Sequence, residues 1–80
     1  MKIPIELSAE SRDLLVRHFK EGTDLHEILD HAARKELAGV DVYSFECEPP
    51  QAETLLEMAR GHCPPAVKDI EHAIFAATAG

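Results

Sequence analysis

The sequence is short of positive charge. Its 80 residues include 8 Lys and Arg against 15 Asp and Glu, which gives a formal net charge of -7 at neutral pH and a pI near 5.0. This balance argues against the broad basic surface of a typical nucleic-acid-binding protein and against attachment to an anionic membrane. A locally basic face is still compatible with it, since residues 1–39 carry a net charge of only -2 (six basic, eight acidic).

Long apolar runs and a cysteine framework are lacking as well. No stretch approaches the roughly 18 apolar residues that cross a bilayer, and the N-terminal "MKIPIELSAES" has no signal-peptide core. We therefore expect no membrane partner and a cytoplasmic location. There Cys47 and Cys63 would be free thiols. A chain this short also buries little surface on its own, so we expect a homodimer.

Catalytic and metal-binding patterns are missing. The chain has five histidines, but His26, His31 and His62 show none of the spacings that hold a metal ion, such as CxxC or HExxH. No nucleophile arrangement and no Gly-rich phosphate loop occurs either. We expect no enzyme activity, no cofactor and no metal, with the histidines solvated or in structural hydrogen bonds.

An alternating pattern opens the chain. In "KIPIEL" the apolar residues alternate with Lys2, Pro4 and Glu6, which predicts a half-buried strand. Proline confines such a strand to a sheet edge or to an unusual pairing. Ser8 is a candidate N-cap for a following helix of about 13 residues. Gly22 would end this helix with a positive φ.

A second helix is predicted from Asp24 to Leu37. Asp24 and Glu27 have the spacing of a capping box, with Asp as the cap. The apolar residues that follow recur at helical spacing and form one broad face. They are Leu25, Ile28, Leu29, Ala32, Ala33 and Leu37.

Residues 2–37 resemble the ribbon-helix-helix (Arc/CopG-like) family. The matching positions are Leu7 at the end of the strand, Leu15, Gly22 at the interhelical turn, and Ile28 and Ala32 in the second helix. The resemblance implies a mainly α fold in which two chains pair their strands and intertwine their helices over residues 1–39. The implied dimer core is Ile3, Ile5, Leu7, Leu15, Phe19, Leu25, Ile28, Leu29 and Ala32.

The resemblance also implies DNA binding, from which this sequence departs. In the family, outward strand residues enter the major groove, here Lys2, Pro4 and Glu6, and the start of the second helix holds a phosphate, here Thr23, Asp24 and Leu25. The Pro4 side chain offers no donor or acceptor. Carboxylates at Glu6 and Asp24 would repel phosphate. The alternative is a ribbon face that is simply solvated.

Residues 40–80 form an acidic extension. "VDVYSF" weakly predicts a strand, and two short helices follow, one from Pro50 to Gly61 and one entered at Pro64 or Pro65. Their apolar faces either complete the core or bind a basic protein partner, as in antitoxins of this family. The candidate partner-binding residues are Leu55, Leu56, Ile70 and Ile74.

Two functional hypotheses follow. The first is a dimeric ribbon-helix-helix transcriptional regulator, of antitoxin type, whose acidic section binds a protein partner. The alternative is a ribbon-helix-helix-like protein-interaction module that does not bind DNA. The charge of the ribbon face is the feature that separates them.

Overall fold

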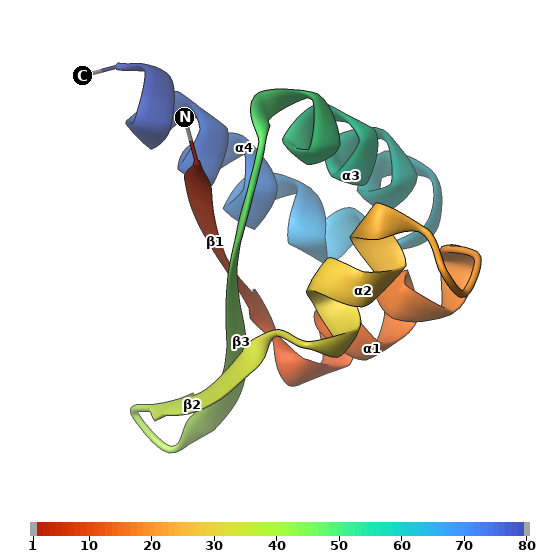
Figure 1. The fold of residues 1–80 in the computed structure, drawn as a ribbon. Coiled ribbons are helices and arrows are strands. Elements are labelled where there is room, and N and C mark those ends of the chain that lie inside the picture. Colours follow the sequence, from red (N-terminus) through yellow and green to blue (C-terminus); the bar gives the residue numbers. More distant parts are fainter. Residues whose placement is uncertain (1, 80) are drawn as a thin grey trace.

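The computed structural model describes residues 2–79, which combine helices with an antiparallel sheet (Figure 1). Helices make up 59% and strands 24% of these residues, so the prediction of a mainly α ribbon-helix-helix fold is wrong. The elements in chain order are β1 (Ile3–Ser8), α1 (Ala9–His18), α2 (Asp24–Asp30), β2 (Ala33–Leu37), β3 (Val40–Cys47), α3 (Pro49–His62) and α4 (Pro64–Thr78).

The first strand finds its partner within the chain. The sheet has the order β1-β3-β2, and β1 pairs with β3 antiparallel from Ile3 opposite Cys47 to Ser8 opposite Val42. The expected pairing of N-terminal strands from two chains is therefore not needed to satisfy β1. The weakly predicted strand "VDVYSF" is the central strand of the sheet. The prediction was weak because Val40 and Val42 lie on one face of β3 and Tyr43, Phe45 and Cys47 on the other, so its apolar residues do not keep one two-residue period.

The predicted second helix ends early. Helix α2 stops at Asp30, and Ala33–Leu37 forms β2, which pairs with β3 through a two-residue loop. Both loop residues have positive φ, +52° at Ala38 and +81° at Gly39, as a type I′ turn requires. Hydrogen bonding to β3 thus overrides the helical spacing of the apolar residues in this segment. The resulting hairpin projects from the body of the domain (Figure 1).

The helix starts follow local sequence signals. Ser8 caps α1 as predicted, its hydroxyl oxygen accepting the Ser11 N–H at 3.2 Å. The helix ends at His18 rather than at Gly22, whose φ of +91° confirms the predicted positive value. Helix α2 is capped by Thr23 instead of Asp24, through the His26 N–H at 3.4 Å.

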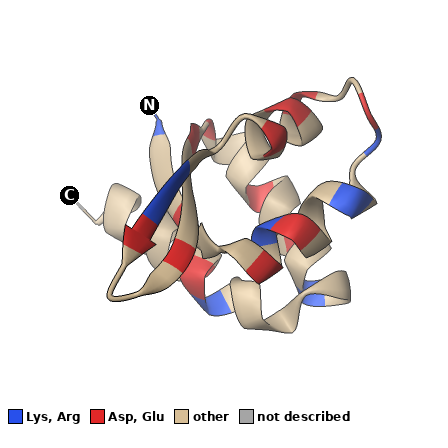
Figure 2. Cartoon of the chain, turned by 90° about the horizontal axis from the view of Figure 1, so that it is seen from below, with Lys and Arg blue, Asp and Glu red and all other residues tan. Residues whose placement is uncertain are grey.

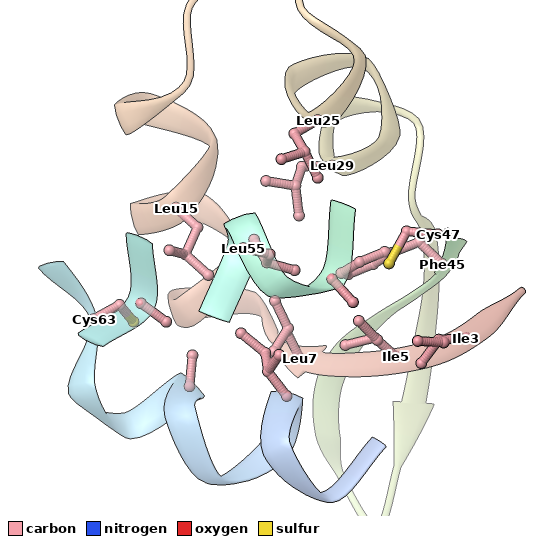
Figure 3. Close-up of a cluster of buried hydrophobic side chains, with 14 residues drawn as sticks. Ile3, Ile5, Leu7, Leu15, Leu25, Leu29, Phe45, Cys47, Leu55 and Cys63 are labelled. Atoms are coloured by element: carbon pink, nitrogen blue, oxygen red, sulfur yellow. The ribbon is translucent and has the colours of Figure 1, made fainter. Parts of the chain in front are cut away.

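One hydrophobic core unites both halves of the sequence (Figure 3). It lies between the inner face of the sheet and the helices. Helices α3 and α4 contribute to the core, so they complete it as the first of the two interpretations expects. The core residues are Ile3, Ile5, Leu7, Leu15, Leu25, Leu29, Phe45, Cys47, Ala52, Leu55, Ala59, Cys63, Ala66 and Ile70. None of the helices within residues 2–79 has the length and apolar character to cross a membrane.

Candidate functional site

The face predicted to contact DNA is the outer face of the sheet. Pro4 and Glu6 are exposed and alternate with buried Ile3 and Ile5, as the strand pattern predicts. The charges on this side are matched within the chain. Lys2 Nζ lies 3.3 Å from Glu48 Oε1, and Lys35 Nζ lies 3.7 Å from Glu6 Oε2. This face therefore presents no excess of positive charge to a phosphate backbone.

The predicted phosphate site at the start of α2 is acidic. Thr23 uses its hydroxyl to cap the helix, and Leu25 is buried in the core. The exposed side of α2 carries Asp24, Glu27 and Asp30, which recur every three residues on one face. Acidic positions also outnumber basic ones over the chain as a whole (Figure 2). Three carboxylates on one exposed face would repel a nucleic-acid phosphate.

The residues assigned to a dimer core lie in or against the core of the single chain. The six that are buried there are Ile3, Ile5, Leu7, Leu15, Leu25 and Leu29. Phe19, Ile28 and Ala32 are partly buried and pack against that core. The part of the predicted apolar face that lies on α2 packs against α1 and β3, whereas Ala33 and Leu37 belong to β2 and are exposed.

The residues assigned to partner binding separate into two pairs. Leu55 and Ile70 are completely buried, so a partner cannot reach them in the folded chain. Leu56 and Ile74 are half-buried and line a groove of about 390 Å³ between α3 and α4. Phe75 also lines this groove and is 70% exposed. We call Leu56, Ile74 and Phe75, with Glu71 and Thr78, the α3–α4 groove.

The surroundings of the α3–α4 groove are acidic. Glu71 Oε2 lies 3.4 Å from Arg60 Nη2, which matches one carboxylate with one cation. Glu53 and Glu57 on α3 are exposed and lie within one helical turn of Leu56. Residues 40–80 carry two basic and seven acidic residues, a net charge of -5. The groove thus joins an exposed aromatic ring to a negative surface.

A larger and more enclosed groove of about 620 Å³ lies between the outer sheet face and α4. Pro4, Glu6 and Lys35 line its sheet side, and Asp69 and His72 belong to its α4 side. The remaining lining residues are Ser44, Ala73, Ala76 and Ala77. It contains no large apolar side chain that could anchor a partner.

The histidines do not assemble a metal or catalytic site among residues 2–79. His18 and His62 stack, with ring centroids 4.0 Å apart and ring planes at 16°. His31 Nε2 lies 3.2 Å from Glu27 Oε2 on the surface of α2. Within the same residues, no group of three or more His, Cys, Asp or Glu side chains is placed to share a metal ion.

Both cysteines are free thiols, as the sequence predicts, and the structure shows that both are buried. Burial in the core raises the pKa of the Cys47 thiol above its ordinary value. Cys47 is therefore poorly suited to act as a nucleophile, which requires the thiolate form.

Sequence reasoning missed Phe75, the most exposed large apolar side chain among the described residues. A signal was present. Ile70 and Ile74 define the buried side of α4, and Phe75 follows Ile74 directly, about 100° further around the helix. A large aromatic residue away from the apolar stripe of a helix is expected to lie at the surface, where a partner can reach it.

Comparison of the chain with protein-family models, with curated proteins and with solved structures finds no match.

Proposed function

We propose that this chain is a protein-interaction module that binds a basic, amphipathic segment of a partner protein in the α3–α4 groove. The observation that carries the proposal is the 70% exposure of Phe75 beside Leu56 and Ile74. Single exposed apolar residues are common on protein surfaces. Here the ring stands next to two half-buried aliphatic side chains in a groove, so an incoming side chain would contact all three.

The geometry supports an apolar anchor with a charged rim. Aromatic residues in grooves are enriched among those that supply most of the binding energy in protein interfaces. An amphipathic helix or an extended segment can place one apolar side chain against Phe75 and Leu56. Covering the exposed ring removes apolar surface from water, which contributes a favourable binding free energy of about 25 cal/mol for each Å² buried.

The negative charge of the module specifies the chemistry of the partner. Glu71 lines the groove, and Glu53 and Glu57 are exposed on α3 within one helical turn of Leu56. Lys or Arg residues flanking the apolar anchor would gain complementary contacts, and the overall charge of -7 would accelerate encounter with a basic partner. Binding should therefore weaken as the salt concentration rises.

DNA binding by a dimeric regulator, the first hypothesis from the sequence, is the second candidate. Helices α1 and α2 are consecutive, as in helix-turn-helix proteins, where the second helix enters the major groove. The exposed face of α2 consists of Asp24, Glu27 and Asp30, which opposes that use. Charge therefore favours a protein partner over DNA, and the regulator stays a prediction.

Selection from a random peptide library displayed on phage tests the proposal, with the full chain as bait. We expect enriched peptides to combine Lys or Arg with apolar residues spaced three or four apart. Phe75→Ala should weaken the binding of a selected peptide by about 2 kcal/mol or more, which raises its Kd about 30-fold. Val40→Ala is the matched control, because Val40 is also a large apolar residue, 55% exposed, but lies on the hairpin.

Two outcomes would contradict the proposal. One is a selection that enriches acidic peptides or nothing above background. The other is a selected peptide whose affinity is the same for the wild type and for Phe75→Ala. Salt-dependent binding of the purified chain to mixed-sequence duplex DNA would instead favour the regulator.

A further inference from the structure

Strand β2 lies at the edge of the sheet, and its free side is open. The strand order β1-β3-β2 gives it a neighbour on one side only, and all five of its residues are exposed. Figure 1 shows the β2–β3 hairpin extending away from the helices. An open edge presents a row of backbone N–H and C=O groups that can pair with another strand.

The pairing with β3 determines which groups point outward. Residues of an antiparallel pair alternate between hydrogen-bonded and non-hydrogen-bonded positions. In a two-residue type I′ hairpin the pair that closes the loop, here Leu37 and Val40, is of the hydrogen-bonded kind. Counting back from this pair, Arg34 and Glu36 occupy non-hydrogen-bonded positions opposite β3. Their backbone N–H and C=O groups therefore point toward the free edge.

We infer that two copies of this chain pair antiparallel through their β2 edges, with Arg34 of each copy opposite Glu36 of the other. Because a two-fold axis perpendicular to the sheet relates the strands, residues on the same face must meet. An axis at Lys35 lets both outward-pointing residues of each copy form backbone hydrogen bonds. The sheet then has six strands in the order β1-β3-β2-β2-β3-β1.

The side chains select this register. A shift by two residues in one direction places Arg34 opposite Arg34 of the second copy, and in the other direction Glu36 opposite Glu36. Like charges directly opposite each other destabilise a strand pair, and opposite charges stabilise it. Glu36 forms no ion pair within the described residues, so its carboxylate is available. Arg34 contacts Asp41 and has further N–H donors to offer.

The side chains on the outer face of the paired strands are also compatible with this register. Leu37 is 50% exposed in the single chain and would lie opposite Ala33 of the second copy, which covers part of it. Lys35 would face Lys35 of the second copy, an unfavourable pair. Each of these lysines is within 3.7 Å of Glu6 of its own chain, which offsets part of that repulsion. Lys35 thus limits the strength of the dimer without preventing it.

The interface is small, so the dimer is expected to be weak. It involves five residues from each chain, and each chain carries a net charge of -7. Interfaces below about 1,200 Å² form transient complexes, with dissociation constants of about 1 µM to 1 mM. Sedimentation at physiological salt over that range should show the 8.8 kDa chain converting to a species of twice its mass.

Charge reversal tests the register. Glu36→Arg places Arg34 opposite an arginine, and Arg34→Glu places a glutamate opposite Glu36, so each variant alone should lose at least about tenfold in dimer affinity. An equimolar mixture of the two restores two opposite-charge pairs in a heterodimer. The mixture should regain most of the wild-type affinity, which a general loss of folding would not allow. Circular dichroism checks that each variant is folded.

Lys35→Thr provides a second test, because removing the facing lysines should strengthen the dimer. Phe75→Ala should leave dimer affinity unchanged, which separates this inference from the α3–α4 groove. The inference is overturned if the wild type stays monomeric over the whole range. It is also overturned if both charge reversals dimerise like the wild type, or if their mixture regains nothing.

Discussion

Replacing Leu55 with Ala should destabilise the fold far more than replacing its neighbour Leu56 with Ala. The two leucines are adjacent on α3 and undergo the same chemical change, so they form a matched pair. Leu55 is 0% exposed and lies in the core among residues of the sheet and helices (Figure 3). Leu56 is half-buried beside the α3–α4 groove.

The expected magnitude follows from burial. A completely buried Leu→Ala change costs about 2.7 to 5 kcal/mol, because the lost burial is accompanied by a cavity. An 80-residue domain has a free energy of unfolding of about 4 to 12 kcal/mol at 0.05 to 0.15 kcal/mol per residue. Leu55→Ala should therefore remove about a fifth or more of the total. Leu56→Ala leaves no enclosed cavity and should cost about 1 kcal/mol or less.

Urea unfolding followed by circular dichroism measures both variants. With an unchanged slope against urea, the shift of the midpoint reports the difference in stability directly. In thermal unfolding, a loss of 3 kcal/mol in a domain of this size lowers Tm by about 12 to 24 °C. Equal destabilisation by the two substitutions would refute the assignment of Leu55 to the core and Leu56 to the surface groove.

Two further predictions concern the hairpin and the buried thiol. Ala38→Asn should stabilise the domain by about 0.5 to 1 kcal/mol in urea unfolding, because Ala38 has a φ of +52° and Asn tolerates the left-handed region better; an unchanged or lower midpoint would contradict the type I′ turn. Burial raises the pKa of Cys47 above its ordinary value of 9.0, so above that pH the unfolded chain loses the thiol proton first and stability falls. Urea midpoints should therefore decline more steeply above pH 9.0 for the wild type than for Cys47→Ala, and parallel declines would count against a desolvated thiol.

The features that the sequence predicted correctly depend on neighbouring residues. Alternation in Ile3–Ser8 reports one buried and one exposed face of a strand, whichever strand lies beside it. The Ser8 cap and the positive φ of Gly22 are likewise set within a few residues. Helix α4 starts at Pro64, one of the two predicted prolines, and α3 starts at Pro49, one residue before the predicted Pro50; both starts reflect the fixed φ of proline.

The features that the sequence predicted wrongly depend on residues far apart in the chain. The pairing of β1 with β3 joins segments separated by more than thirty residues, and nothing within Ile3–Ser8 indicates which strand will lie beside it. Without knowledge of that pairing, the backbone hydrogen-bonding groups of the N-terminal strand appeared to require a strand from a second chain. The same lack of long-range information affected the predicted partner-binding residues. Leu55 and Ile70 are buried in the core of the folded chain, which their local sequence does not indicate.

The composition of β2 conflicts with its conformation, and this conflict bears on its role. Its sequence, Ala33–Leu37 or "ARKEL", consists of residues that favour helices, and Ala, Lys and Glu are depleted in strands. Such local conflicts are expected at functional sites more often than elsewhere. All five residues are exposed, so β2 gains little from burial and is held mainly by its pairing with β3. A second copy along the free edge would supply backbone hydrogen bonds and charge pairs that a single chain cannot. Dimerisation through β2 would thereby stabilise the segment of the fold that its own sequence supports least.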